Sequence, residues 1–145
     1  MNTEHVHLKI ESKTEKLSAV REFVSDAARK FGFAEESVGK IALAVDEACT
    51  NVIKHSYNYA PNKEIDIRII AENGVFEIVI THQGKTFDPD AVKPPDMREY
   101  LSHYRKGGLG IHLMRSLMDT VEYRVRPDKK SEVHLFKRIP AAMSR

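Results

Sequence analysis

The stretch EIDIRIIAENGVFEIVIT, residues 64–81, decides the fold of this chain of 145 residues. Its first half alternates isoleucine with charged residues, and its second half places Phe76, Ile78 and Ile80 on one face. This period of two is typical of strands that bury one side. The Asn73-Gly74 pair between the halves favours a tight hairpin turn, because both residue types tolerate positive φ. The stretch therefore predicts two strands joined by a turn.

Outward from this hairpin, the hydrophobic periodicity predicts three helices and three further strands. In chain order they are a strand over 5–10, helices over 14–31 and 34–56, a helix that opens at 107–110, and strands over 121–126 and 132–139. A turn over 57–63 and a long loop over 82–106 join them. The loop holds three of the six prolines, and loops of this length inside a domain are usually functional. The element order predicts an α+β fold, a two-layer α/β sandwich formed by one domain over residues 1–145.

The composition argues against several classes of function. Lys and Arg number 23 and Asp and Glu number 21, so the net charge of +2 gives no electrostatic reason to expect nucleic acid or an anionic membrane as a partner. The single cysteine, Cys49, excludes an intrachain disulfide. No apolar run approaches the roughly 18 residues of a membrane span. The first twenty residues do not resemble a secretory signal, so we expect a cytoplasmic protein.

The helix predicted over 34–56 has an apolar face and a polar side. At 100° per residue, the core face comprises Val38, Ile41, Ala42, Val45, Ala48, Cys49, Val52 and Ile53. On the opposite side Glu47, Asn51 and Lys54 follow one another at i, i+4 and i+7, with His55 on the flank. This side is either a solvated surface or a ligand face. A ligand face could use the carboxylate as a base, the amide oxygen for Mg²⁺, and the cations for phosphate.

A glycine-rich segment, Lys106-Gly107-Gly108-Leu109-Gly110, comes directly before the third helix. Glycines allow close approach of the backbone to a ligand, and a helix N-terminus presents free N–H groups to an anion. Arg105 and Lys106 add positive charge there. The segment is either a phosphate site or a hinge that feeds a helix, and it has neither P-loop nor dinucleotide-binding spacing.

Three segments, taken in order, resemble the motifs of the Bergerat-type ATPases. Residues 47–55 (EACTNVIKH) resemble the N box, residues 82–88 (HQGKTFD) the first glycine box, and residues 107–114 (GGLGIHLM) the second. The small size and the stretch GGLGIHLMRSLMD make the chain similar to bacterial anti-sigma-factor serine kinases. This resemblance covers roughly residues 5–139. It implies a mixed, mostly antiparallel sheet covered by helices on one face.

The resemblance also implies cofactors and residue roles. The cofactors are ATP and Mg²⁺, with Glu47 as the general base that activates a serine or threonine hydroxyl of a partner protein. Asn51 holds the metal, and the loop over about 89–106 forms the ATP lid. The implied ATP-binding residues are Asn51, Lys54, His55, His82, Gly84, Asp88, Arg105, Lys106, Gly107, Gly108, Leu109, Gly110 and Ile111.

Two positions depart from the family pattern. His82 stands where the first glycine box normally begins with an aspartate that accepts the adenine amino group. A neutral imidazole accepts one hydrogen bond without the charge assistance of a carboxylate, which weakens such a bond. Lys130-Ser131 stands where relatives often have Gly-Thr.

Competing functions follow from the resemblance and its departures. The first is an ATP-dependent serine/threonine kinase that phosphorylates an anti-anti-sigma partner and sequesters a sigma factor. The second is a binding module without ATP turnover, which His82 favours. The third, a sensor-kinase ATPase domain, is disfavoured because no helix pair with a phosphorylatable histidine is apparent. The resemblance implies a homodimer through the first strand and first helix, although burial within the monomer explains the apolar residues of that strand equally well.

Overall fold

The computed structural model describes residues 4–83 and 108–139 of the chain. The helical elements are a 3-10 turn η1 (Thr14–Lys16), α1 (Leu17–Phe31), α2 (Glu35–Asn51), a π-helical turn η2 (Val52–Ser56) and α4 (Gly108–Leu117). The strands are β1 (Glu4–Glu11), β2 (Glu64–Glu72), β3 (Val75–His82), β4 (Thr120–Val125) and β5 (Ser131–Arg138). Every element expected in these ranges is present, and the lid expected over 89–106 lies outside the described residues.

The five strands form one sheet in the order β1-β2-β3-β5-β4, and each neighbouring pair is antiparallel. The sheet in the described residues is thus antiparallel throughout rather than mixed. The predicted hairpin is confirmed, because Asn73 and Gly74 have φ values of 51° and 77° at the turn between β2 and β3. Those values are the conformation that a tight hairpin turn between right-twisted strands needs.

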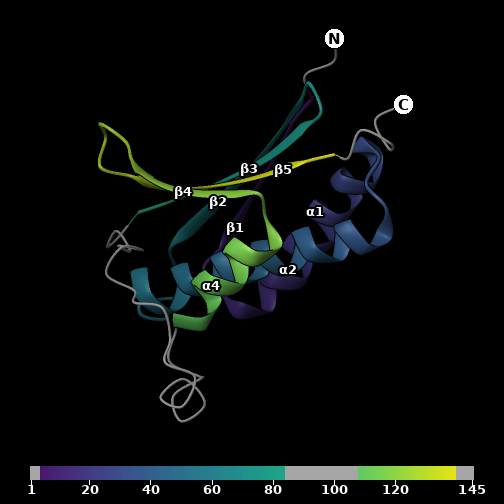
Figure 1. Ribbon diagram of the computed structural model, residues 1–145. Coiled ribbons are helices and arrows are strands. Elements are labelled where there is room, and N and C mark those ends of the chain that lie inside the picture. The colour runs from purple at the N-terminus through teal and green to yellow at the C-terminus, as the bar shows by residue number, and fades with distance from the viewer. Residues whose placement is uncertain (1–3, 84–107, 140–145) are drawn as a thin grey trace, which may run out of the picture.

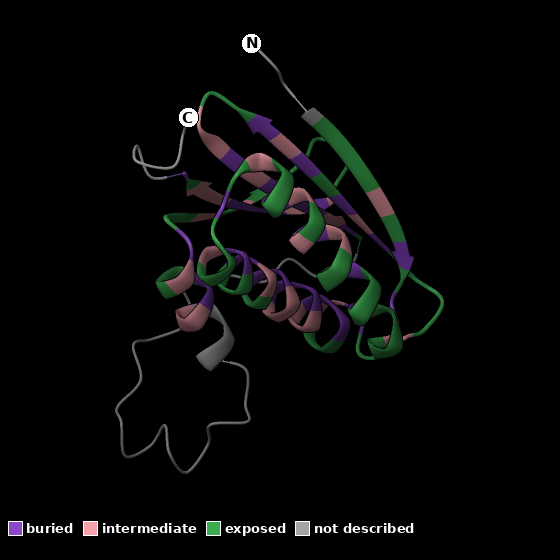
Figure 2. Ribbon diagram, turned by 90° about the vertical axis from the view of Figure 1, so that its right-hand side faces the viewer, coloured by how far each residue is buried: buried purple, intermediate pink, exposed green. Residues whose placement is uncertain are grey.

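The three α-helices lie together on one face of the sheet (Figure 1). The alternating isoleucines point to this face, where Ile67 pairs with Ile80 and Ile69 with Ile78, all fully buried. Figure 2 shows the buried residues gathered between the two layers. Burying one such side chain stabilises the fold by about 1.5–3 kcal/mol. The two-layer α+β architecture is therefore confirmed.

Helix α1 packs through four buried residues at helical spacing: Leu17, Val20, Val24 and Ala28. The predicted helix over 14–31 is divided, because its first three residues form the 3-10 turn η1. Gly32 ends α1 in the left-handed region at φ 112°.

Helix α2 differs from the prediction in its last turn and in one face residue. The predicted helix over 34–56 is α-helical only to Asn51, after which the Tyr57 N–H donates to the Val52 carbonyl at 2.9 Å in π geometry. Ala44 is fully buried, whereas Ala42, which we expected in the core, is only half-buried. The core face is therefore turned toward α4, which packs along α2 together with α1.

The opposite face of the sheet, which we call the open face, carries a charged cluster around His134. In the described residues no helix covers this face (Figure 1). His134 on β5 is only 5% exposed, with Nδ1 at 2.7 Å from a Glu77 carboxylate oxygen and Nε2 at 2.9 Å from a Glu132 carboxylate oxygen. The imidazole also stacks on Phe136 at 6.2 Å between ring centroids. The open face thus has an ordered polar structure of its own.

Candidate functional site

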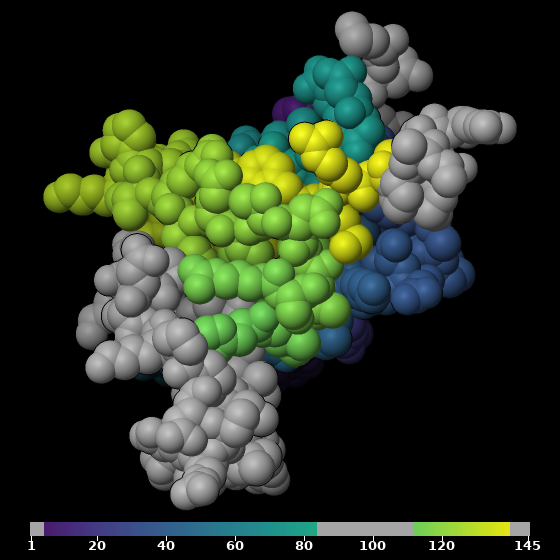
Figure 3. Space-filling view, in the orientation of Figure 1, coloured from purple at the N-terminus to yellow at the C-terminus, as the bar shows by residue number. Residues whose placement is uncertain are grey.

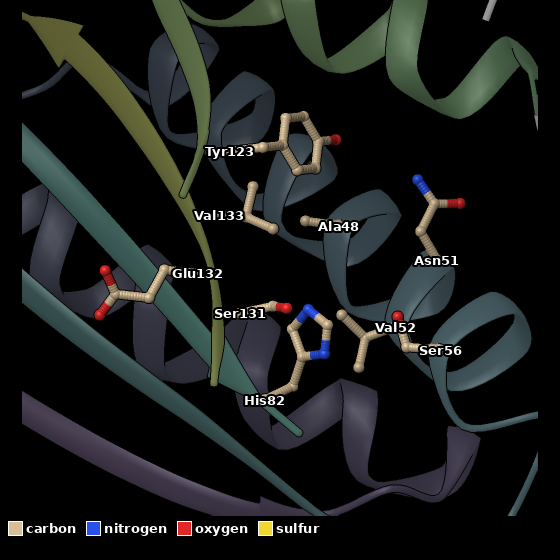
Figure 4. A pocket seen from close by; sticks show the side chains of 9 residues that line it. All are labelled: Ala48, Asn51, Val52, Ser56, His82, Tyr123, Ser131, Glu132 and Val133. Atoms are coloured by element: carbon tan, nitrogen blue, oxygen red, sulfur yellow. The ribbon is translucent and has the colours of Figure 1, made fainter. Parts of the chain in front are cut away.

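A pocket lies where β3 ends beside the last turn of α2, and we call it the His82 pocket (Figure 4). Its lining comes from α2, η2, β3, β4 and β5. The lining residues are Ala48, Asn51, Val52, Ser56, His82, Tyr123, Ser131, Glu132 and Val133. In Figure 3, α4 lies below β4 on the side nearest the viewer.

His82 is the last residue of β3 and is only 4% exposed. Its Nδ1–H donates to the Gln83 carbonyl oxygen at 3.1 Å, and its ring meets the edge of Tyr57 at 6.0 Å. Burial lowers the pKa of His82 because it penalises the charged imidazolium, and the bond to Gln83 only partly offsets this effect. The imidazole is therefore neutral at pH 7, with its remaining lone pair on Nε2.

Tyr57 fixes the chain around His82. Its hydroxyl donates to the Glu64 carbonyl at 2.6 Å and accepts the Gln83 N–H at 2.8 Å. Desolvation by burial raises the pKa of Tyr57, so the phenol keeps its proton. From the sequence we expected Tyr57 in a turn, without this role. An aromatic residue directly after a polar helix end was the only signal, and it does not indicate which strand end the ring will meet.

Asn51 ends α2 and contributes its amide to the His82 pocket (Figure 4). Its Nδ2 is the one buried side-chain nitrogen or oxygen of the described residues that has no hydrogen-bond partner. A buried amide without a partner is costly and points to a ligand at the site. The helical wheel put Asn51 opposite the core, but α4 packs along α2, and Tyr123 of β4 and Ser131 of β5 line the pocket with Asn51.

Glu47 lies one turn before Asn51 and is half-buried. Desolvation raises the pKa of Glu47, the nearby Asp46 carboxylate adds to the increase, and Lys54 opposes it. The Asp46 carboxylate forms an ion pair with the Arg21 guanidinium, with 2.6 Å between Oδ1 and Nη1. A carboxylate with a raised pKa is a better proton acceptor at neutral pH. Neither Glu47 nor the exposed Lys54 and His55 lines the His82 pocket, so the polar side of α2 extends beyond it.

The glycine-box residues are only partly described. Gly84, Asp88, Arg105, Lys106 and Gly107 lie outside the described residues. Helix α4 begins at Gly108, so Gly108, Leu109, Gly110 and Ile111 form its first turn, as expected. The first four N–H groups of a helix have no partner within it, which suits an anion.

Two further features narrow the chemistry of the described residues. Cys49 is fully buried, and burial raises its pKa to about 12, so its thiol is no nucleophile. No group of three or more His, Cys, Asp or Glu side chains in the described ranges could hold a metal ion. This still suits Mg²⁺, which takes one or two protein ligands and fills its shell with phosphate oxygens and water.

Comparisons of the whole chain with known proteins agree on one family. Residues 10–137 match the family model of the histidine kinase-like ATPase domain. The chain is 33% identical over 125 residues to the serine-protein kinase RsbW of Halalkalibacterium halodurans, which covers 83% of this chain and 76% of the relative. It is 30% identical over 125 residues to the serine-protein kinase RsbW of Bacillus subtilis, with coverage of 83% and 78%.

A solved structure shares the fold. The crystal structure of the RsbU and RsbW domains of a Mycobacterium tuberculosis protein matches with a TM-score of 0.66 at 14% identity. The match covers 95% of this chain and 34% of that longer chain. At this identity the likeness establishes the architecture alone.

Proposed function

The chain belongs to the histidine kinase-like ATPase domain family, and from that premise we propose that it is an anti-sigma factor and ATP-dependent serine/threonine protein kinase. Its substrate is an anti-anti-sigma protein in a partner-switching circuit, and its second partner is the sigma factor that it sequesters. Two relatives at 33% and 30% identity carry the name serine-protein kinase, which supports the reaction class.

The observation that carries this proposal is the partnerless Nδ2 of Asn51 in the His82 pocket. The fold leaves the Asn51 amide unused on this side, so a bound group can meet it. A nucleotide offers acceptors for the amide nitrogen, and a magnesium ion suits the amide oxygen. The residues present therefore fit both ATP and Mg²⁺, with Asn51 as the metal ligand.

The chain's own residues divide the work. Bound ATP with Mg²⁺ supplies the γ-phosphoryl group and neutralises its charge. Glu47, whose pKa is raised, takes the proton of the partner's serine or threonine hydroxyl. Lys54 and His55, about one turn beyond Asn51, lie near the phosphates. The first turn of α4 contributes backbone N–H groups from Gly108, Leu109, Gly110 and Ile111.

Residues outside the described ranges complete the proposed site. Gly84 allows the backbone to approach the base, and Asp88 belongs to the same box. Arg105, Lys106 and Gly107 border the phosphates, and the segment over about 89–106 serves as the lid. All of them belong to one domain over residues 1–145.

A second candidate, a binding module without turnover, is favoured by His82. A neutral imidazole offers the base an uncharged acceptor, which is worth less than the charge-assisted bond to a carboxylate. Such a module would sequester a sigma factor or antagonist and leave Glu47 idle. The two candidates differ in phosphoryl transfer rather than in fold.

We also propose a cytoplasmic homodimer formed through β1 and α1. β1 pairs only with β2 in the described sheet, so its other edge is open to a second chain. A hollow beside it is lined by Val6, Phe23, Ala27 and Phe76 among others. No helix of the described residues is long and apolar enough to cross a membrane. Sedimentation equilibrium tests the dimer, and a single species of monomer mass across micromolar concentrations would contradict it.

Isothermal titration with ATP, with and without Mg²⁺, tests the nucleotide site. We expect magnesium-dependent binding in the micromolar range. Transfer of labelled γ-phosphate to a purified anti-anti-sigma protein then separates the two candidates. Phosphoserine or phosphothreonine on the substrate supports the kinase, and magnesium-dependent binding without transfer supports the module. Absence of binding at millimolar ATP overturns the nucleotide site itself.

A further inference from the structure

Residue 82 is a histidine where the family normally has an aspartate. Its hydrogen bonding therefore depends on which ring nitrogen carries the proton. The Gln83 carbonyl can only accept, and it lies 3.1 Å from Nδ1, so Nδ1 must be the protonated nitrogen of a neutral ring. Nε2 then has a lone pair and no hydrogen. In Figure 4 the ring extends toward Ser131 and the interior of the pocket, the side on which Asn51 also lies.

Gln83, which supplies this carbonyl, is anchored to the rest of the fold through its N–H. Gln83 presents its carbonyl from a backbone whose N–H is bonded to the Tyr57 hydroxyl at 2.8 Å, and that hydroxyl is tied to the Glu64 carbonyl at 2.6 Å. Reversing the tautomer would place a lone pair on Nδ1 against the Gln83 carbonyl. That exchange loses a buried hydrogen bond and opposes two acceptors, which is unfavourable. The backbone at the end of β3 therefore sets the hydrogen-bonding character of the ring.

We propose that Gln83 locks His82 as an acceptor at Nε2, so that the pocket selects a purine with an amino group at position 6 and binds it only while the ring is unprotonated. This inference rests on the proposed function, since it assigns a base preference and a pH response to the nucleotide site. An adenine amino group donates to Nε2. A keto oxygen at position 6 would instead face the lone pair of Nε2. Both atoms are acceptors, so neither would receive a hydrogen bond.

His82 also lines a second hollow, which it shares with Tyr57, Glu64 and Asp66 among others. Among the described residues that line the pocket and this hollow, His82 is the only imidazole, so we assign the pH response to it. The carboxyl groups and phenols of those linings are Glu64, Asp66, Glu132, Tyr57 and Tyr123, and the lysines are Lys9, Lys63 and Lys130. Burial raises the pKa of Tyr123 to about 12, so its hydroxyl stays neutral. Burial lowers the pKa of His82, so the acceptor survives to more acidic pH than an exposed imidazole would.

Two measurements test the inference, and the first does not depend on nucleotide binding. Nitrogen-15 NMR of the ring, assigned by comparison with His82→Gln, distinguishes the two neutral tautomers in the protein alone. We expect a protonated Nδ1 and an unprotonated Nε2 at pH 8. A spectrum with the proton on Nε2 would overturn the proposal whatever the protein binds.

The second measurement compares ATP with inosine triphosphate, which differs at position 6 of the base. The wild type should bind inosine triphosphate about 10- to 100-fold more weakly. His82→Gln should lose most of this discrimination, because a glutamine amide can turn over and donate to the keto oxygen. The ratio of wild-type to His82→Gln affinity for ATP should be constant above about pH 6.5 and fall by up to tenfold per pH unit as the ring protonates.

The controls separate the two levels of the proposal. The ligand phosphates titrate equally in both proteins, so the affinity ratio isolates the ring. If ATP binds but the two proteins show the same pH profile and the same discrimination, the inference fails and the proposed function stands. If neither protein binds any purine triphosphate at pH 8, both fail. Should His82→Gln not fold, the discrimination of the wild type between ATP and inosine triphosphate still decides the matter.

Discussion

Two histidines of this molecule are equally buried and serve opposite purposes. His82 lies at the end of β3 beside α2, is 4% exposed, and donates from Nδ1 to the Gln83 carbonyl. His134 lies on the open face of the sheet, is 5% exposed, and meets the carboxylates of Glu77 and Glu132 through its two nitrogens. The His134 ring therefore bridges two acidic side chains, one on β3 and one on its own strand β5.

The difference teaches that burial alone does not decide what a histidine does. At His134 both ring nitrogens meet acidic side chains, and the ring joins β3 to β5 as part of the structure. At His82 the charge is excluded, and a lone pair is kept on the side where Asn51 has an unused amide. The first arrangement stabilises the fold, and the second costs stability and leaves hydrogen-bonding capacity inside the pocket. Substitutions on the side of the sheet that holds the His82 pocket can be compared with substitutions on the open face.

The largest effect is expected on phosphoryl transfer, from Glu47→Gln in α2. Phosphoryl transfer should fall by about 100- to 10,000-fold because the proton acceptor is lost. ATP affinity should stay within a few fold, and the free energy of unfolding should change by less than about 0.5 kcal/mol. Transfer of labelled phosphate and urea unfolding measure the two quantities. A collapse of nucleotide binding would make Glu47 a structural residue.

The open face is tested by His134→Leu. Removing the imidazole leaves two largely buried carboxylates without their shared donor, so the free energy of unfolding should fall by about 2–4 kcal/mol. Figure 4 shows the Glu132 carboxylate directed away from the His82 pocket, so ATP affinity should change less than twofold. Urea unfolding and calorimetric titration check both. Combining the change with Glu77→Gln should restore part of the stability, and additive losses would contradict the cluster.

A smaller effect is expected from Asn51→Ala. Magnesium-dependent ATP affinity should fall by about 10- to 100-fold, because the amide no longer meets the metal or the nucleotide. Stability in the absence of ligand should be unchanged or slightly higher, since the buried Nδ2 has no partner to lose. Titration with and without magnesium separates the two outcomes. An unchanged affinity in magnesium would refute the metal assignment.

The smallest effect is the pH dependence of stability due to His82. Its pKa is lowered in the folded state, so the unfolded chain binds a proton at the ordinary value near 6.5 while the folded chain does not. Stability should therefore decline as the pH falls below about 6.5, by at most about 1.4 kcal/mol per pH unit, until the folded ring protonates. The difference between wild type and His82→Gln in urea unfolding from pH 8 to pH 5 isolates this contribution. A flat difference would show that His82 is not desolvated.

Much of the architecture was predictable because it depends on local pattern. The period of two around Asn73-Gly74 identified both strands of the hairpin, and the helical spacing identified α1 and α2. The π-helical turn after Asn51 was not predictable, because one changed hydrogen bond leaves the apolar pattern nearly intact.

The candidate site was predictable in its residue types and less so in its geometry. The helical wheel named Asn51 but could not show that it lines a pocket, because a wheel contains no information on how β4 and β5 pack beside α2. The tautomer of His82 depends on a backbone carbonyl whose direction no residue type encodes. His134 was not singled out at all, because Glu77 is 57 positions away and becomes its neighbour only through the β3–β5 register. The roles expected for residues within 84–107 stay predictions, because these residues lie outside the described ranges.

The pairing of β1 with β2 has a consequence for synthesis. His7 and Asp66 face each other across this pair although they are 59 positions apart, and both helices α1 and α2 lie between them. At about 5–20 residues per second, β1 leaves the ribosome roughly 3–12 seconds before its partner β2. During that interval its apolar residues, including Val6, Leu8 and Ile10, have no sheet to join. The docking of the N-terminal strand is thus the step at which a nascent chain is most open to misassembly and to capture by a chaperone.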